Sequence, residues 1–277
     1  MEIIKTDLKL MLYKKEFYIA QLIMFLLCFG NSMILYNNYY GKDISNVIQA
    51  SGFNMGISGR SVSTIFFTII YSFMFPLIVC LSYSDSYLFE KSKNINILMI
   101  TRVNKTKYLL SKYLVIGFSG FLVIFIPYII NFLISFIVAP MYNDYSHSNL
   151  GSDIYIPTTE NIIFPEIYTK YPYLESLIYV LIPSMFGSAI ALTSYSISLL
   201  KKVTRLTVLI LPTIIYNLYS FITAIFQGPY LSIECYLHPD DGLTGLSICK
   251  LLVIFIFLIL LSFIPLMLKI KLNKDDF

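Results

Sequence analysis

The sequence is short of charge, histidine, cysteine and tryptophan. Charged residues make up 13% of its 277 positions, 57% of the positions are hydrophobic, and tryptophan is absent. Water-soluble domains carry about twice that share of charge, so the composition excludes a soluble globule. A chain this apolar needs lipid as its solvent.

Histidine is too scarce for the common catalytic and zinc-binding motifs. The two histidines, His147 and His238, lie in predicted loops, and neither belongs to an H-E-x-x-H or a Cys/His zinc pattern. The Pro-Asp-Asp-Gly run after His238 is typical of a turn. A phosphate-binding G-x-x-x-x-G-K-[ST] loop is also missing. We therefore expect no catalysis, no metal site and no bound cofactor in this chain.

The four cysteines are too few for a disulfide scaffold. Cys28 and Cys80 lie within apolar runs, where cysteine acts as a small apolar residue. Cys235 and Cys249 flank a predicted outer loop, and the sequence leaves a bridge between them open.

Six apolar runs are long enough to cross a bilayer, which takes roughly 20 residues per helix. They cover residues 17–36, 61–82, 113–139, 175–200, 206–226 and 247–268. The sequence thus predicts one all-α, polytopic membrane domain over residues 1–277. An irregular external loop is expected over residues 140–174 and an external or re-entrant segment over 227–246. A kink or break is expected at the proline of each of runs two to six, which are Pro76, Pro127, Pro183, Pro212 and Pro265.

Residues 1–16 read as an amphipathic helix lying on the membrane surface. The expected apolar face consists of Ile4, Leu8, Met11 and Leu12, and the expected polar face of Lys5, Asp7, Lys9 and Lys14.

Lysine and arginine gather on one side of the predicted topology. Four precede the first run, six lie in residues 83–112, three follow the fourth run and three follow the sixth. The other four are Lys42, Arg60, Lys170 and Lys250. The positive-inside rule therefore places both termini and residues 83–112 in the cytoplasm. Charge is missing from the middle of every run, which disfavours proton-coupled carriers and voltage sensors.

The cytoplasmic segment over residues 83–112 combines positive charge with an apolar patch. The patch consists of Ile95, Ile97, Leu98, Met99 and Ile100. A surface of this kind needs a partner that buries it. One interpretation is an interfacial helix with its apolar side in the lipid headgroups. The other, which we favour, is a docking element for a separate cytoplasmic protein.

Polar and small residues inside the runs predict contacts other than lipid. Gln21, Asn31, Asn131 and Asn217 are candidates for lining a path through the membrane. The fourth run carries a small-residue surface that favours close helix packing within or between subunits, formed by Gly187, Ser188, Ala189, Ala191, Ser194 and Ser198.

The order of these elements resembles the ABC-2 family of exporter permeases. Phe89-Glu90-Lys91 is followed by the apolar turn Ile97-Leu98-Met99 and then by Arg102-Val103-Asn104-Lys105. The stretch Tyr108-Leu109-Leu110-Ser111-Lys112 then leads into the third run. Where family members often have a Gly-Thr pair, this chain has Asn94-Ile95-Asn96.

The resemblance implies a partner that this chain does not itself contain. Residues 94–101 would form a coupling helix seated in an ABC ATPase subunit, which acts as a dimer and holds the ATP and Mg, and the N-terminal helix would brace that contact. The coupling residues would be Glu90, Lys91, Ile95, Ile97, Leu98, Met99, Arg102 and Lys105. A second, identical or similar permease would complete the translocation path, and Pro229 to Leu246 would be the counterpart of the family's re-entrant helices.

Two functions from different classes follow. The first is the permease subunit of an ATP-driven exporter for an amphipathic cargo such as an antimicrobial peptide or antibiotic. The second is a membrane scaffold or sensor that binds a cytoplasmic partner without transport. The richness in Ile, Asn, Lys and Tyr favours a bacterial cell membrane, and the basic residues form no contiguous surface for nucleic acid.

The predicted topology can be tested by thiol labelling in intact cells. A cysteine placed at Ile97 or Lys105 is expected to resist an impermeant reagent and to react only after the membrane is opened. Reaction from the external face of intact cells would contradict the topology.

Overall fold

The computed structural model describes residues 2–42, 47, 49–53, 65–141, 163–226, 231–237 and 246–271. All regular structure within these ranges is helical. The six helices long and apolar enough to cross a membrane are α2 (Lys15–Tyr39), α4 (Ile65–Tyr83), α7 (Lys105–Val138), α9 (Pro172–Ser198), α10 (Arg205–Ile225) and α12 (Ile248–Lys271). The predicted all-α chain with six apolar helices is confirmed for these residues, and its makeup is that of a multi-pass membrane protein.

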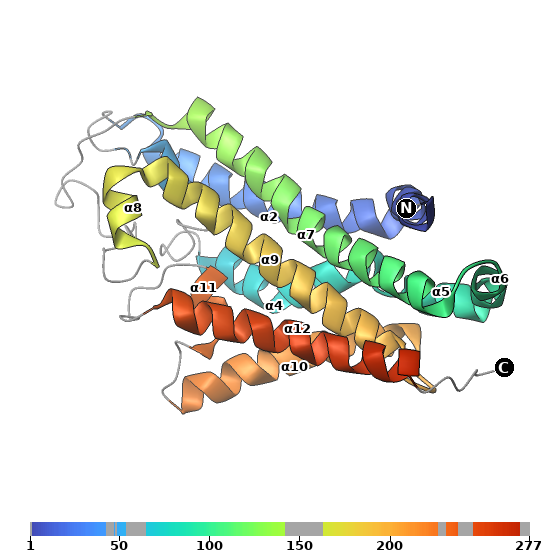
Figure 1. Ribbon diagram of the computed structural model, residues 1–277. Coiled ribbons are helices and arrows are strands. Elements are labelled where there is room, and N and C mark those ends of the chain that lie inside the picture. The colour runs from blue at the N-terminus through green and yellow to red at the C-terminus, as the bar shows by residue number, and fades with distance from the viewer. Residues whose placement is uncertain are drawn as a thin grey trace.

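Shorter helices gather at the two ends of the bundle (Figure 1). One end, which we call the α6 end, carries α1 (Glu2–Tyr13), α5 (Ser86–Ser92) and α6 (Ile95–Arg102). The opposite end, the α8 end, carries η2 (Ala50–Phe53), α8 (Pro165–Lys170) and α11 (Glu234–Leu237). The polar segment between the second and third apolar helices therefore projects from one end only.

Helix α9 forms the centre of the bundle and packs against α4, α7, α10 and α12 (Figure 1). Its contact with α7 is the closest, because glycines meet there. A Cβ atom added at Gly120 would lie 2.8 Å from the carbonyl oxygen of Gly187 and 2.6 Å from the Cβ of Ala191. The predicted small-residue surface of residues 187–198 thus packs within the subunit, where small side chains let two helix backbones approach.

Helices α2 and α7 are joined by a buried polar contact. The Nδ2 of Asn131 donates to the Oγ of Ser32 at 2.5 Å and to the carbonyl oxygen of Cys28 at 3.3 Å. In lipid such a bond offers the amide a partner that the solvent does not supply. Asn131 therefore serves as a packing residue between these two helices.

Several expectations about local structure are corrected. Each of the five prolines expected to kink or break a helix lies inside a continuous one, so no break occurs there and a kink stays a prediction. In lipid the rest of the backbone can only satisfy its hydrogen bonds by staying helical, so the loss of one donor does not end the helix. The loop expected to be irregular contains α8, and α9 begins at Pro172. Glu175 therefore lies in the first turn of α9, where it is fully buried.

Other expectations fall partly or wholly outside the described residues. Residues 61–64 and 142–162, both histidines and most of the segment 227–246 lie there, so the re-entrant segment stays a prediction. No disulfide joins Cys235, which is buried, to Cys249, which is exposed, so the bridge left open by the sequence is not formed between these two described residues.

The glycine contact predicts a graded response to added methyl groups. Gly120→Ala places Cβ against the backbone of α9 and is expected to lower the free energy of unfolding by about 1–3 kcal/mol. Gly117→Ala is the matched control, because its Cβ would meet only the side chains of Leu192 and Ser188, both at 3.2 Å, which can shift. Thermal unfolding of the detergent-solubilised protein measures both, and equal melting temperatures would contradict the prediction.

Candidate functional site

The turn between α5 and α6 depends on an unusual backbone conformation. Asn94 adopts a φ of 56°, in the left-handed region that asparagine enters more readily than other non-glycine residues. This residue ends the path of α5 and starts α6 in a new direction. After α6 the chain becomes extended at Val103, and the side chain of Asn104 caps α7 by accepting from the backbone N–H of Thr106 at 3.1 Å.

Helix α6 is held at the surface and turns apolar side chains outward. None of its eight residues is buried by other described residues. Leu98 is 61% exposed, and Ile95 and Ile97 are each 37% exposed. Met99 and Ile100 are partly buried against the core, so they attach the helix to the bundle. The apolar patch predicted from the sequence thus divides into an inner and an outer side.

Helix α5 is fixed to the bundle by a buried cluster of three charges. The ammonium of Lys112, on α7, lies 3.0 Å from Asp7 Oδ1 of α1 and forms a close ion pair with Glu90 of α5. The side chains of Lys112 and Asp7 have no exposed surface, and that of Glu90 is 9% exposed. We call these three residues the Lys112 cluster.

Hydroxyl groups complete the bonding of the Lys112 cluster. Tyr108 donates to Glu90 Oε2 at 2.5 Å, and Ser111 donates to Asp7 Oδ2 at 2.9 Å. Two carboxylates share one ammonium, so the additional donors stabilise the remaining negative charge. A buried ion pair needs such bonds, because the desolvation of charge otherwise exceeds the Coulombic attraction. The cluster therefore locks α1, α5 and α7 into one arrangement.

A second, more exposed set of ion pairs lies beside it. Asp85, between α4 and α5, pairs with Lys14 and with the Nε of Arg205 at 2.5 Å. Arg205, at the start of α10, also pairs with Glu16 of α2 at 2.7 Å. Water weakens the pair between Arg205 and Glu16, whose side chains are 53% and 30% exposed, so this pair contributes less to stability than the Lys112 cluster. The pair between Asp85 and Lys14 is more buried, with side chains 3% and 17% exposed.

The structure corrects the expected environment of two charges. Asp7 was expected on the polar face of the N-terminal helix, but it is fully buried on the same side as Met11, whereas Leu12 is 47% exposed. The spacing carries a signal for this, since Asp7 follows Ile4 by three residues and precedes Met11 by four. From the sequence, Lys112 is expected only to act as a charge that orients the chain in the membrane. In the structure it also forms buried ion pairs with Asp7 and Glu90.

The predicted coupling residues separate into inner and outer groups. Glu90 points inward to Lys112, and Met99 packs against the core. The apolar residues that remain outside are Ile95, Ile97 and Leu98. Lys91 is half-buried on α5, Arg102 is exposed at the end of α6, and Lys105 is half-buried at the start of α7.

The four candidates for lining a path lie on three helices, α2, α7 and α10. Asn31 and Asn131 are buried within the subunit. Gln21 is half-buried on α2, and Asn217 is half-buried on α10, where its Nδ2 donates to the carbonyl oxygen of Thr213 at 2.9 Å. Their role in a path stays a prediction. In the described ranges, no group of three or more His, Cys, Asp or Glu residues is arranged to hold a metal ion.

The Lys112 cluster predicts a large cost when its cation is removed. Lys112→Met leaves two buried carboxylates without a counter-ion and is expected to lower the free energy of unfolding by about 3–5 kcal/mol. Lys107→Met, at an exposed position of the same helix, is the control and is expected to have little effect. The triple variant D7N/E90Q/K112M should regain part of the loss. Equal unfolding of K112M and K107M would contradict the cluster's role.

Comparison with known proteins adds no family to this description. No family model, no curated protein and no solved structure matches the chain. The function is therefore argued from the α6 end itself.

Proposed function

We propose that this chain is the permease subunit of an ATP-driven exporter of the ABC-2 type, in a bacterial cell membrane. Helices α5 and α6 would dock on a separate ATPase, which holds the nucleotide and Mg. The N-terminal helix α1 would lie in the membrane surface beside them. Both termini and the α6 end would face the cytoplasm, as the distribution of lysine and arginine favours.

The observation that carries this proposal is the contrast between α5 and α6. Helix α5 is anchored through Glu90 in the Lys112 cluster, while α6 presents the most exposed apolar side chain of its segment, Leu98, at 61%. An exposed apolar group on a rigid support has the character of an interface anchor, because little conformational freedom is lost when a partner covers it. A polar loop with no partner to bind would not need the anchoring that Glu90 gives to α5.

The conformation of Asn94 also supports the resemblance. Family members often have glycine after the charged residues, and this chain has Asn94 there with a φ of 56°. Glycine adopts this conformation without strain, and asparagine is the next most tolerant residue. Asn94 differs from the glycine of the family pattern, but it allows the same left-handed turn of the backbone.

The cargo we propose is amphipathic, such as an antimicrobial peptide or antibiotic, moved between this subunit and a second permease. Tyrosine and phenylalanine total 45 residues, and Gln21 and Asn217, both half-buried, add polar groups to α2 and α10. A composition of this mixed character suits a molecule that carries both apolar and polar groups. Half-buried polar residues rather than the buried Asn31 and Asn131 are the ones such a path would use.

The docking proposal predicts contact between Leu98 and an ATPase. A photo-crosslinking amino acid at position 98, in cells of the natural host, is expected to capture a protein that has a phosphate-binding loop. The same amino acid at Leu114, exposed on the apolar part of α7, is the control and is expected to capture none. Leu98→Asp should weaken the complex by roughly thirtyfold, as loss of an anchor worth about 2 kcal/mol implies.

The activity of the purified complex separates the alternatives. ATP hydrolysis and its coupling to transport should fall in Leu98→Asp and stay unchanged in Thr101→Ala, an exposed residue of the same helix. A scaffold or sensor would bind its partner without transport in either protein. Full transport activity without a nucleotide-hydrolysing companion, or crosslinks from position 98 to lipid alone, would refute the proposal.

A further inference from the structure

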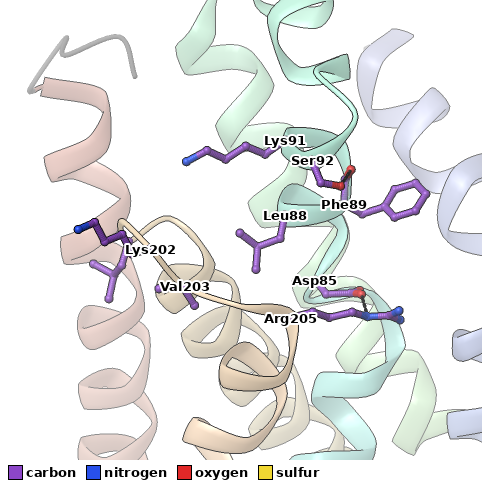
Figure 2. A pocket seen from close by; sticks show the side chains of 9 residues that line it. Asp85, Leu88, Phe89, Lys91, Ser92, Lys202, Val203 and Arg205 are labelled. Carbon is purple, nitrogen blue, oxygen red and sulfur yellow. Dashed lines mark hydrogen bonds and ion pairs between the residues drawn. The ribbon is translucent and has the colours of Figure 1, made fainter. Parts of the chain in front are cut away.

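A cavity of about 370 Å³ opens between α5 and the turn that joins α9 to α10. Figure 2 shows Lys91 reaching across it from α5, Lys202 and Val203 on the turn, and Arg205 beside Asp85. The cavity lies where α9 ends at Ser198 and α10 begins at Arg205. It therefore occupies the boundary between the spanning helices and the polar α6 end.

The lining of the cavity has a surplus of positive charge. Three cations, Lys91, Lys202 and Arg205, face one acid, Asp85. The charge of Asp85 is already matched by its ion pairs with Lys14 and Arg205. Among the residues that the structure describes, Lys91 and Lys202 form no ion pair. Two ammonium groups are thus left to meet an anion.

Apart from the hydroxyl of Ser92, the rest of the cavity lining is apolar. Leu88 comes from α5, and Leu200 and Val203 come from the turn, whereas Figure 2 shows the ring of Phe89 pointing away from the turn. Leu200 is 51% exposed. An inorganic anion would leave these groups in water, whereas a ligand with an apolar part would cover them. The cavity therefore selects a molecule that is anionic at one end and apolar at the other.

The backbone of the turn holds one of the two lysines in an uncommon conformation. Lys202 has a φ of 58°, in the left-handed region, which costs free energy for a residue with a side chain. Glycine or asparagine would form the same turn with less strain. A lysine at this position is explained if its charge is used in the cavity.

We propose that this cavity binds the headgroup of an anionic phospholipid from the leaflet at the α6 end. Lys91 and Lys202 contact the phosphate, and Leu88 and Val203 cover the first part of the acyl chains. Basic pockets between membrane helices recognise anionic headgroups by this combination. A zwitterionic lipid carries its own cation, so it gains less from the two lysines. The proposal concerns α5 and the α9–α10 turn and does not depend on the docking of an ATPase.

The bound lipid would join two parts of the bundle. Helix α5 belongs to the arrangement locked by the Lys112 cluster, whereas the turn belongs to α9 and α10. A phosphate held by one lysine from each side closes the gap between them. Anionic lipid is therefore expected to restrain α10 relative to α5.

The test measures lipid binding by the full-length protein in a neutral detergent with native mass spectrometry. Dioleoyl phosphatidylglycerol and dioleoyl phosphatidylcholine are titrated separately, and inorganic phosphate is added in a third series. The wild-type protein is expected to bind one phosphatidylglycerol at least tenfold more tightly than phosphatidylcholine. The variant K91Q/K202Q should bind phosphatidylglycerol about 25-fold more weakly, at about fivefold for each lysine.

The control variant K9Q/K107Q removes the same charge from exposed positions outside the cavity and should stay within twofold of wild type. The single variants K91Q and K202Q, each expected to lose about fivefold, keep the test decisive if the double variant unfolds. Unchanged phosphatidylglycerol binding in the lysine variants would overturn the proposal. Displacement of the lipid by millimolar inorganic phosphate would overturn its assignment to a lipid.

Discussion

The burial of one ammonium group between two carboxylates sets the arrangement of the α6 end. Lys112, Asp7 and Glu90 come from three different helices, and each would be costly to leave alone in an apolar interior. If one of the three helices moved away, the charges left behind would be buried without an ion-pair partner. The helices α1, α5 and α7 therefore keep a single arrangement. Everything that α6 presents outward depends on this, since α6 is connected to α5 at one end and to α7 at the other.

The two sets of ion pairs differ in burial, and that difference divides the end of the bundle into a fixed and an adjustable part. The Lys112 cluster is closed to water, whereas Arg205 is 53% exposed while it joins α10 to Asp85 and Glu16. Exposed pairs exchange partners with water at little cost. Helix α10 can therefore shift against α1, α5 and α7 more easily than these three can shift against one another. A force applied to α6 would pass into α7 directly and into α10 only through the weaker contacts.

Features that depend on composition, such as the apolar helices, can be predicted from the sequence. Contacts between residues that are far apart in the sequence cannot. Six apolar runs predict six helices, because lipid leaves the backbone no alternative to internal hydrogen bonds. The outward position of Leu98 follows from an apolar patch within a charged segment. The pairing of Asp7 with Lys112 could not be predicted from the sequence. A lysine beside an apolar run is explained equally well as a charge that orients the chain in the membrane. The turn at Asn94 and the cavity near Lys202 depend on single backbone conformations, which local patterns do not specify.

The length of α7 explains why the Lys112 cluster lies where it does. Its 34 residues extend about 51 Å, well beyond the roughly 30 Å of a hydrocarbon core. Lys112 is about 10 Å from the start of the helix, so enough of α7 follows it to cross a hydrocarbon core. At this depth a cation can orient the chain during insertion and then pair with acids during packing. Since its partners are Asp7 and Glu90, α1 and α5 must lie on the side of the membrane where Lys112 stays. Under the positive-inside rule, the side on which Lys112 stays would be the cytoplasmic one, and α6, which follows α5 directly, would be presented on that side.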